Sequence, residues 1–373
     1  MSWRWMWVLM VVMPSAWAQR PPETVPGGVS RQSHVLSYDR SSLPGDIELL
    51  PRKTVLGYST DVSRGFGLIH LTCRSNTNSA NGACPQEDTG LPPASGVTKI
   101  ALRFTEARSG LQTDVMVRGA LQRAYGGRTC YLDSWNPNDY LISSSSSPQC
   151  VDTGASGTGV LLSVPAEELG KLVAGHWAAE LILDLRTASL GPVVASYEFT
   201  FDLTITDHNA VSIYFPAFPN VSPLVALNAG YDPISRTIGG RTVLDMCLYD
   251  GLGSQAQYLG VTVRDTGTRP PGPSGFSLWH DTAGNDDSQR LDYTVTLDHN
   301  GTTVPLTNGV EEQLHGIDAA QLRMVMLPGM SQPVFCVPTP MTLEIPRVPV
   351  STKRSGIYWG DLKVELRVPT TTP

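Results

Sequence analysis

The sequence is poor in charged residues, and above all in lysine. Charged residues make up 16% of the 373-residue chain, and only five of its 27 basic residues are lysines, whereas about a quarter of an ordinary globular protein is charged. The formal net charge of −7 and the absence of a basic stripe argue against a nucleic-acid-binding protein. The 41% of hydrophobic residues, combined with this modest net charge, argues against intrinsic disorder.

The sequence also lacks the short motifs of common catalytic and metal sites. It has no G-x-S-x-G nucleophile elbow, no Walker loop, no H-E-x-x-H pair and no calcium-binding loop. The seven histidines are scattered, and no C-x-x-C occurs. The G-x-G at Gly157 and Gly159 has neither a third glycine nor a following helix, so we expect a turn there. We therefore expect a protein that is not an enzyme and binds no cofactor or metal.

Two pairs of adjacent acids leave one enzymatic alternative open. They are Glu167-Glu168 and Asp286-Asp287, and a glycosidase needs two carboxylates that flank a sugar bond. Solvated loop acids are the simpler interpretation. The alternative is a secreted β-sandwich carbohydrate hydrolase that loses its activity when Glu168 or Asp287 is removed.

Long hydrophobic runs are absent after the first 18 residues. Within those residues, Arg4 precedes the apolar stretch Trp5–Met13, and Ala16-Trp17-Ala18 has the A-x-A form of a cleavage site. The stretch is too short for a membrane span of about 20 residues. We expect residues 1–18 to be a secretory signal peptide, with Gln19 as the first residue of an exported protein.

Turn-forming residues are abundant, with 35 glycines and 29 prolines. This abundance favours an all-β protein, and several runs alternate apolar and polar residues as half-buried strands do. Asn300-Gly301 lies between two such runs and predicts a hairpin. We expect a helical turn at most over Pro165–Leu172. The alternating runs cover residues 99–104, 115–118, 181–186, 197–205, 211–215, 291–305 and 362–368, and a further strand is expected over 243–249.

A polar break at residues 207–209 divides the strand pattern. We place two domains around it, residues 19–206 and residues 209–373. The frequent short strands separated by turns favour two immunoglobulin-like β-sandwich domains in tandem. Residues 19–50 show few alternating runs, and the two halves show no internal repeat.

All six cysteines lie after the expected signal peptide, and an even number in an exported chain suggests disulfides. Six cysteines allow 15 pairings, and the sequence alone does not choose among them. The spacing favours two local pairs and one long-range pair, each contributing roughly 2–4 kcal/mol. These pairs are Cys73–Cys84, Cys130–Cys150 and Cys247–Cys336.

Arginines crowd the predicted first domain. Their planar guanidinium groups suit carboxylate, phosphate or sialic-acid recognition. They form either solvated strand faces or an anion-accepting patch, and the sequence leaves both interpretations open. These arginines are Arg103, Arg108, Arg118, Arg123, Arg128 and Arg186.

The last predicted strand has the form of a pilus-subunit ending. Gly356–Gly360 precedes alternating Leu362, Val364, Leu366 and Val368. A pilin domain that lacks one strand leaves an apolar groove beside its last strand, which a chaperone strand and then a neighbouring subunit fill. Without a partner, the open edge would aggregate. The alternative is an ordinary C-terminal strand.

Several segments together resemble the CfaE/CblD family of pilus-tip minor subunits, the tip adhesins of class 5 (alternate-chaperone) fimbriae. The resemblance covers most of residues 66–368, and the six cysteines follow the family's order and spacing. The segments are Asn81–Pro85 (NGACP), Leu102–Ser109 (LRFTEARS), Val164–Leu172 (VPAEELGKL) with Gly175-His176-Trp177, and Val243–Gly251 (VLDMCLYDG).

This resemblance implies an N-terminal adhesin domain and an incomplete C-terminal pilin domain that a donor strand completes. The implied partners are a periplasmic chaperone, an outer-membrane usher, the major pilin subunit and a host-cell glycoconjugate. The protein would pass through the periplasm, initiate fimbrial assembly and remain at the fimbrial tip on the cell surface as a virulence factor. A tip subunit without receptor binding is the structural alternative.

The family's receptor arginines do not carry over cleanly. Members that bind host cells use one arginine before the first cysteine and a pair at the end of the strand after Gly-x-Trp, and the matching positions here are Leu68, Thr187 and Ala188. Arg186 lies beside two of them, and Arg64 is near the first. We therefore take Arg186, Arg108 and Arg64 as candidate receptor-binding residues.

Overall fold

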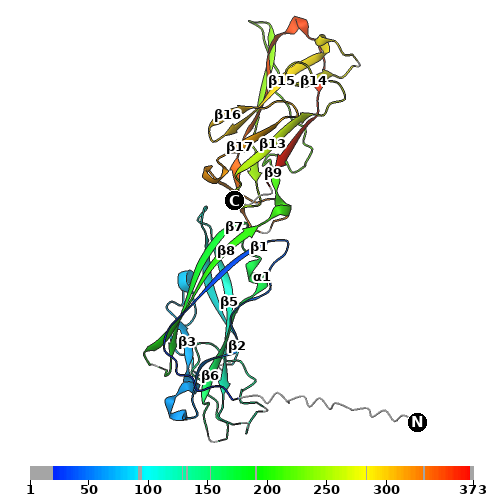
Figure 1. Cartoon of the computed structure of the whole chain (residues 1–373). Coiled ribbons are helices and arrows are strands. Elements are labelled where there is room, and N and C mark those ends of the chain that lie inside the picture. The colour runs from blue at the N-terminus through cyan, green and yellow to red at the C-terminus, as the bar shows by residue number, and fades with distance from the viewer. Residues whose placement is uncertain are drawn as a thin grey trace, which may run out of the picture.

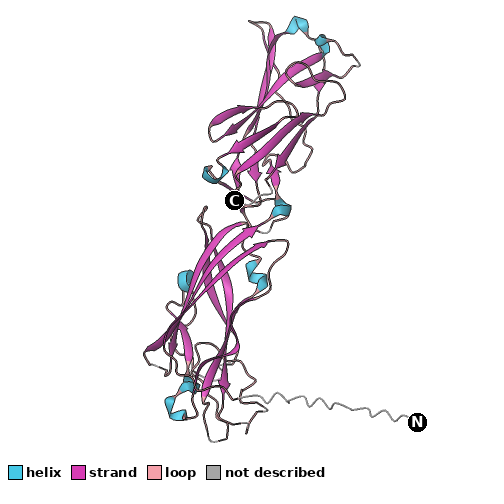
Figure 2. Cartoon of the chain, in the orientation of Figure 1, coloured by secondary structure: helices cyan, strands magenta, loops and turns pink. Residues whose placement is uncertain are grey.

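The computed structural model describes residues 20–90, 95–127, 129–131, 133–151, 153–189, 191–282, 284–330 and 332–369. The expected signal peptide therefore lies outside the described residues. The chain forms two β-rich bodies arranged end to end, with only short helical turns between strands (Figures 1 and 2). We call residues 20–206 the first domain and residues 212–369 the second. The prediction of an all-β protein with two domains is confirmed.

The first domain is built on one eight-stranded sheet. Its strand order is β1-β8-β7-β4-β5-β6-β2, and β3 pairs with β7 outside this path. All pairs are antiparallel except β1 with β8, which run parallel from Gly28 opposite Ala195 to Asp39 opposite Thr206. The strands are β1 (Gly28–Asp39), β2 (Ile47–Tyr58), β3 (His70–Cys73), β4 (Thr98–Glu106), β5 (Gln112–Ala124), β6 (Gly157–Val164), β7 (Gly175–Arg186) and β8 (Val193–Thr206).

The second domain contains three smaller sheets. Their orders are β10-β11-β20-β15-β14-β21 with β16 on β15, then β18-β19-β12-β9, then β17-β13-β22. The strands are β9 (Ser212–Tyr214), β10 (Gly230–Asp232), β11 (Thr237–Leu244), β12 (Cys247–Tyr249), β13 (Tyr258–Asp265), β14 (Phe276–His280), β15 (Arg290–His299), β16 (Thr302–Pro305), β17 (Glu311–His315), β18 (Arg323–Val325), β19 (Val334–Pro338), β20 (Met341–Pro349), β21 (Tyr358–Trp359) and β22 (Leu362–Arg367).

Helical structure is confined to single turns. The one α-helix of the described residues, α1 (Ala166–Leu169), lies within the run for which a helical turn was predicted. In the part of the chain that the structure describes, no helix is long and apolar enough to cross a membrane. The 3-10 turns are η1 (Val62–Arg64), η2 (Phe66–Leu68), η3 (Ser79–Asn81), η4 (His208–Ala210), η5 (Asp287–Gln289), η6 (Ile317–Ala319) and η7 (Val350–Thr352).

All three predicted disulfides are confirmed. Their Cα–Cα distances are 5.2 Å for Cys73–Cys84, 5.8 Å for Cys130–Cys150 and 5.7 Å for Cys247–Cys336. The predicted hairpin is also confirmed, because β15 and β16 pair with His299 opposite Thr302. The two turn residues both have positive φ, 52° for Asn300 and 75° for Gly301, as the tight turn favoured by Asn-Gly requires.

Two sequence-based expectations were wrong. The run 243–249 is not one strand, because β11 ends at Leu244 and β12 begins at Cys247 in a different sheet. The G-x-G is not a turn but the start of β6. A Cβ on Gly157 would lie 2.7 Å from the backbone oxygen of Gly57, and one on Gly159 would lie 2.7 Å from the Trp135 ring. Glycine is needed at both positions because neighbouring groups pack closely on the strand.

Candidate functional site

The second domain contains an open apolar groove of about 2140 Å³ beside its last strand. β22, the red strand next to β13 in Figure 1, pairs with β13 alone among the described residues. The groove runs past this unpaired edge and continues along the extended segment that follows β9. Its floor consists of apolar side chains from the large sheet, namely Leu278, Leu291, Tyr293, Met341, Leu343 and Ile345.

The predicted groove residues alternate along β22 as expected for a strand with one buried face. Leu362 and Val364 line the groove itself. Leu366 and Val368 are half-buried and pack against the same core beyond the lined stretch. Polar residues between them form ion pairs on the other face, such as Arg264 with Glu365 at 3.1 Å. One row of β22 side chains is therefore free to contact a partner strand without disturbing the other row.

The opposite wall of the groove was not predicted from the sequence. It is the segment Pro219–Leu227, which lies in the groove lining. Pro223, Val225 and Leu227 are half-buried, and the residues between them are exposed, as in a strand. The segment forms no backbone–backbone hydrogen bonds with the described part of the chain. The prolines of this segment argue against a strand, so the segment was not predicted. The alternation of Val225 and Leu227 is the feature from which it could have been predicted.

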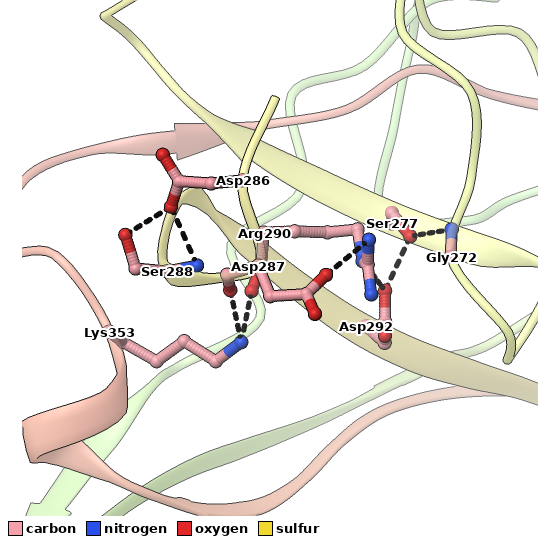
Figure 3. A network of polar contacts seen from close by, with 8 residues as sticks. All are labelled: Gly272, Ser277, Asp286, Asp287, Ser288, Arg290, Asp292 and Lys353. Atoms are coloured by element: carbon pink, nitrogen blue, oxygen red, sulfur yellow. Dashed lines mark hydrogen bonds and ion pairs between the residues drawn. The ribbon is translucent and has the colours of Figure 1, made fainter. Parts of the chain in front are cut away.

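A polar network fixes the loops at the end of the groove (Figure 3). Lys353 donates to the backbone oxygens of Asp287, at 2.7 Å, and Arg290, at 2.6 Å. The guanidinium of Arg290 also contacts the carboxylates of Asp287 and Asp292, both at 2.8 Å. Because Lys353 belongs to the segment that leads into β21 and β22, these contacts anchor the chain just before the open edge.

Arg64 and Arg186 lie together at the far end of the first domain. Arg186 lies at the end of β7, opposite His70 in the β3–β7 register. Its guanidinium donates a hydrogen bond to the Gly191 backbone oxygen at 2.5 Å. The turn after Arg64 packs against Thr187, since a Cβ on Gly65 would lie 3.7 Å from the Thr187 oxygen. The exposed Arg64 side chain lies over the Phe66 ring at 5.9 Å.

The positions that match the family's receptor arginines fall in this same loop cluster. Leu68 is exposed and follows the Arg64 turn, Thr187 is half-buried, and Ala188 is exposed. None of the three carries a charge. Two arginines, Arg64 and Arg186, therefore lie on segments next to the three matching positions, in place of three arginines at those positions.

The buried Arg123 links the segment after the Arg64 turn to the serine run. Its guanidinium is fully buried and donates to the backbone oxygens of Ile69, Ser144 and Ser146, and to the Thr158 hydroxyl, over 2.5–2.9 Å. Burial lowers its pKa to about 10, so the group is still protonated at neutral pH. Arg123 thus ties the serine run to the start of β3.

The structure does not gather the first-domain arginines into one patch. Arg103 and Arg118 form ion pairs with Asp114, at 3.7 Å, and Glu167, at 2.6 Å. Arg123 is buried, and Arg128 lies outside the described residues. The solvated-face interpretation therefore holds for the two strand arginines.

Arg108 lies at the junction of the two domains, apart from Arg64 and Arg186. Its Nη2 donates to the backbone oxygens of Ile317, at 2.5 Å, and Ala320, at 2.9 Å, both in the second domain. Close backbone contact accompanies these bonds, because a Cβ on Gly253 would lie 2.6 Å from the Cα of Gly175. The hydrogen bonds of Arg108 thus join the domains.

The acids that kept the enzymatic alternative open do not converge. Glu168, in the first domain, accepts a hydrogen bond from the Met116 amide at 2.8 Å and contacts Lys171 at 2.5 Å. Asp287 lies in the second domain. The two carboxylates therefore do not flank one sugar bond. Among the described residues, no group of three His, Cys, Asp or Glu side chains is placed to hold a metal ion.

Comparisons with known proteins cover both domains. Residues 14–208 match the family model for the first domain of CfaE, a subunit of CFA/I fimbriae, and residues 211–370 match the model for the second domain of the same subunit. The CFA/I fimbrial subunit CfaE of Escherichia coli is 30% identical to the chain over 313 residues, which is 80% of each protein.

Solved structures are also similar to the chain over most of its length. The crystal structure of CfaE, the adhesive subunit of CFA/I fimbria of enterotoxigenic Escherichia coli, is similar with a TM-score of 0.68 and 26% identity, over 94% of this chain and 95% of that one. A chain from a chaperone–tip adhesin complex, described as vital for synergistic activation of CFA/I fimbriae biogenesis, matches with a TM-score of 0.67 and 26% identity, over 94% and 99%.

Proposed function

The chain belongs to the CfaE family of CFA/I fimbrial subunits, and from this premise we propose that it is the adhesive tip subunit of a fimbria. The second domain accepts a strand from a partner, and the far end of the first domain binds a host-surface glycoconjugate. The protein acts by binding rather than by catalysis. It is exported through the periplasm and stays at the fimbrial tip on the cell surface.

The observation that carries this proposal is the open groove between β22 and Pro219–Leu227. Both walls have an alternating apolar face; among the described residues β22 pairs on one side only, and Pro219–Leu227 forms no backbone–backbone hydrogen bond. A strand added between them would gain main-chain hydrogen bonds on both sides and bury its apolar side chains against the floor. In the periplasm a chaperone strand fills the groove, and after transfer at an outer-membrane usher the major pilin subunit replaces it.

The N-terminal residues support a position at the tip. Residues of β1 pair with β8 along their whole length, and Thr24 bridges to Tyr58. These residues are committed to the first domain and cannot serve as a donor strand for another subunit. The chain can therefore accept a strand from one neighbour but not supply this segment to a second one, as an initiating subunit requires.

Replacing Val364 with aspartate tests strand acceptance. A charge in the apolar groove loses its hydration without gaining a partner, so we expect capture by the chaperone to fail and the periplasmic yield to fall at least tenfold. The measurement is co-purification of the chaperone with the tagged chain. Lys363→Gln changes the neighbouring residue and should preserve both capture and yield. Equal yields for the two variants would contradict the groove assignment.

Substitution of Arg64 and Arg186 tests adhesion. The double change to alanine removes both guanidinium groups from the loop cluster, and we expect binding of fimbriated cells to host cells to fall at least tenfold. Arg31→Ala serves as the control, because Arg31 is exposed on β1 and forms an ion pair with Glu198. If the wild-type chain assembles fimbriae without binding any host surface, the alternative of an initiating subunit without receptor binding replaces this part of the proposal.

A further inference from the structure

The apolar groove of the second domain meets the first domain at one end only. Arg40 and Ser41 of the first domain and the linker residues 209–211 line that end. Val350 and Ile357 line the opposite end. Val350 begins η7, the orange turn at the end of the second domain that points away from the first (Figure 1). Because the first domain occupies one end, a strand in the groove can join a globular body only at the end formed by Val350 and Ile357.

Apolar side chains continue past this open end, onto the β10–β11 hairpin. Tyr231 lies opposite Ile238, and Ile238 lies opposite Val348. Cross-strand partners share one face of a sheet, and Ile238 lines the groove, so the three side chains lie on the groove side of the sheet. Tyr231 is 56% exposed there. The floor of the groove therefore extends to the edge of the domain and leaves an aromatic ring uncovered.

The turn of this hairpin presents an apolar side chain to solvent. Ile234 is 95% exposed at the turn, where Gly, Pro, Asn, Asp and Ser are the usual residues. The Asp232 carboxylate accepts a hydrogen bond from the Ile234 amide at 2.9 Å, and Arg347 contacts the same carboxylate at 3.3 Å. The Val350 amide donates to the Arg236 oxygen at 3.0 Å, which ties the turn to η7. The exposed isoleucine is therefore held in a fixed position.

We propose that a patch of exposed apolar side chains at the open end contacts the globular body of the subunit whose strand fills the groove. This inference rests on the proposed function, because strand acceptance brings that subunit to the open end. Exposed apolar residues that gather in one place mark a contact with another molecule, and a turn that is already fixed loses little entropy on binding. This distal patch consists of Tyr231, Ile234, Val350 and Ile357, which are between 41% and 95% exposed.

The distal patch gives the donor subunit a second point of attachment. The groove holds the strand of that subunit, and the patch covers apolar surface on its body. The strand alone would leave the body free to swing about the point where the chain emerges from the groove. Contact with Ile234 and Tyr231 instead fixes the angle between the two subunits, so the patch sets how the tip is mounted on the fibre.

Photo-crosslinking in assembled fimbriae tests this contact. Ile234 is replaced by the photoreactive amino acid p-benzoylphenylalanine, and the products of illumination are identified by mass spectrometry. We expect an adduct with the major pilin subunit at residues outside its donor strand. Val243 carries the probe in the control, because it is 55% exposed and lies near the other end of β11, opposite Thr342 on the face away from the groove. An adduct from position 234 with the donor strand only or with another protein, or no adduct, overturns the proposal.

A probe at Val221 separates this proposal from the proposed function. Val221 lines the groove and is fully exposed, so p-benzoylphenylalanine at this position should crosslink to the donor strand itself. If position 221 gives no adduct with a donor strand, strand acceptance fails. If position 221 gives that adduct and position 234 gives none with the body of the same subunit, only the distal patch fails.

Ile234→Asp tests whether the contact helps to hold the donor subunit. At the guanidinium concentration where half of the wild-type complexes survive, we expect the fraction that retains the major pilin subunit to fall at least fivefold. Retention of a synthetic peptide with the sequence of the donor strand should not change. Val243→Asp places the same charge on the other face and should affect neither complex. Equal effects of Ile234→Asp on subunit and peptide, or no effect on the subunit, would contradict a contact with the body.

Discussion

At the scale of single residues, Arg123 shows how a buried charge can serve an exposed surface. A buried cation is costly unless hydrogen bonds satisfy it. Here backbone oxygens from two segments, Ile69 and the serine run, provide that satisfaction, while the Tyr140 ring lies 5.8 Å away. The segment that follows the Arg64 turn is thereby tied to the serine run by a side chain that is itself fully buried. Its sequence context, an arginine in an alternating strand, gives no sign of this role.

Replacement of Arg123 by methionine should destabilise the first domain. Each buried carbonyl left without a donor costs about 1–3 kcal/mol, so we expect the free energy of unfolding to fall by about 3 kcal/mol or more in urea denaturation. Arg103→Met is the control, because that ion pair lies at the surface and is worth about 1 kcal/mol or less. Similar losses in the two variants would show that Arg123 does not hold the loops.

At the scale of secondary-structure elements, the sequence correctly predicts a strand where one local feature, such as a turn motif, determines its position. The β15–β16 hairpin was predicted because Asn300-Gly301 fixes its turn. β1 was missed because its outward face includes the exposed Val29 and Val35, while polar Gln32 and His34 face inward. Its apolar and polar residues therefore do not alternate as a half-buried strand's usually do, and only pairing with β8 makes it a strand.

The candidate groove was predictable from one side only. β22 alternates strictly, so Leu362 and Val364 could be assigned from the sequence. The other wall, Pro219–Leu227, contains prolines and lacks a partner, and its position depends on packing against residues distant in the chain. The junction role of Arg108 was equally hidden, since its acceptors at Ile317 and Ala320 lie more than 200 residues away.

The segment Pro219–Leu227 should become ordered when the groove is filled. Without backbone hydrogen bonds to the described chain, its amide protons should exchange with solvent within seconds. In the complex with a donor strand, we expect the amides of residues 221–227 other than Pro223 to be protected at least a hundredfold, as measured by hydrogen–deuterium exchange mass spectrometry. The β15–β16 hairpin is an internal control that should not change. Unchanged exchange in the segment would mean that the added strand lies elsewhere.

At the scale of the whole molecule, the two domains share one core at their junction. Cys247, Tyr249 and Val334 of the second domain belong to the same buried cluster as the core of the first. Arg40 pairs with Asp207 in the linker at 2.8 Å. A tip subunit that accepts a strand at one domain and a receptor at the other must transmit force between them, and this junction is continuous rather than a flexible tether.

Arg108→Ala should uncouple the two domains. The change leaves the carbonyls of Ile317 and Ala320 without their donor, so the junction should loosen while each domain keeps its own core. In differential scanning calorimetry of the chain bound to a donor strand, we expect the single transition of the wild type to split into two. Arg118→Ala, which breaks a surface ion pair with Glu167 away from the junction, should keep one transition. If both variants unfold in a single transition, the shared core alone couples the domains, and the Arg108 hydrogen bonds are not needed for it.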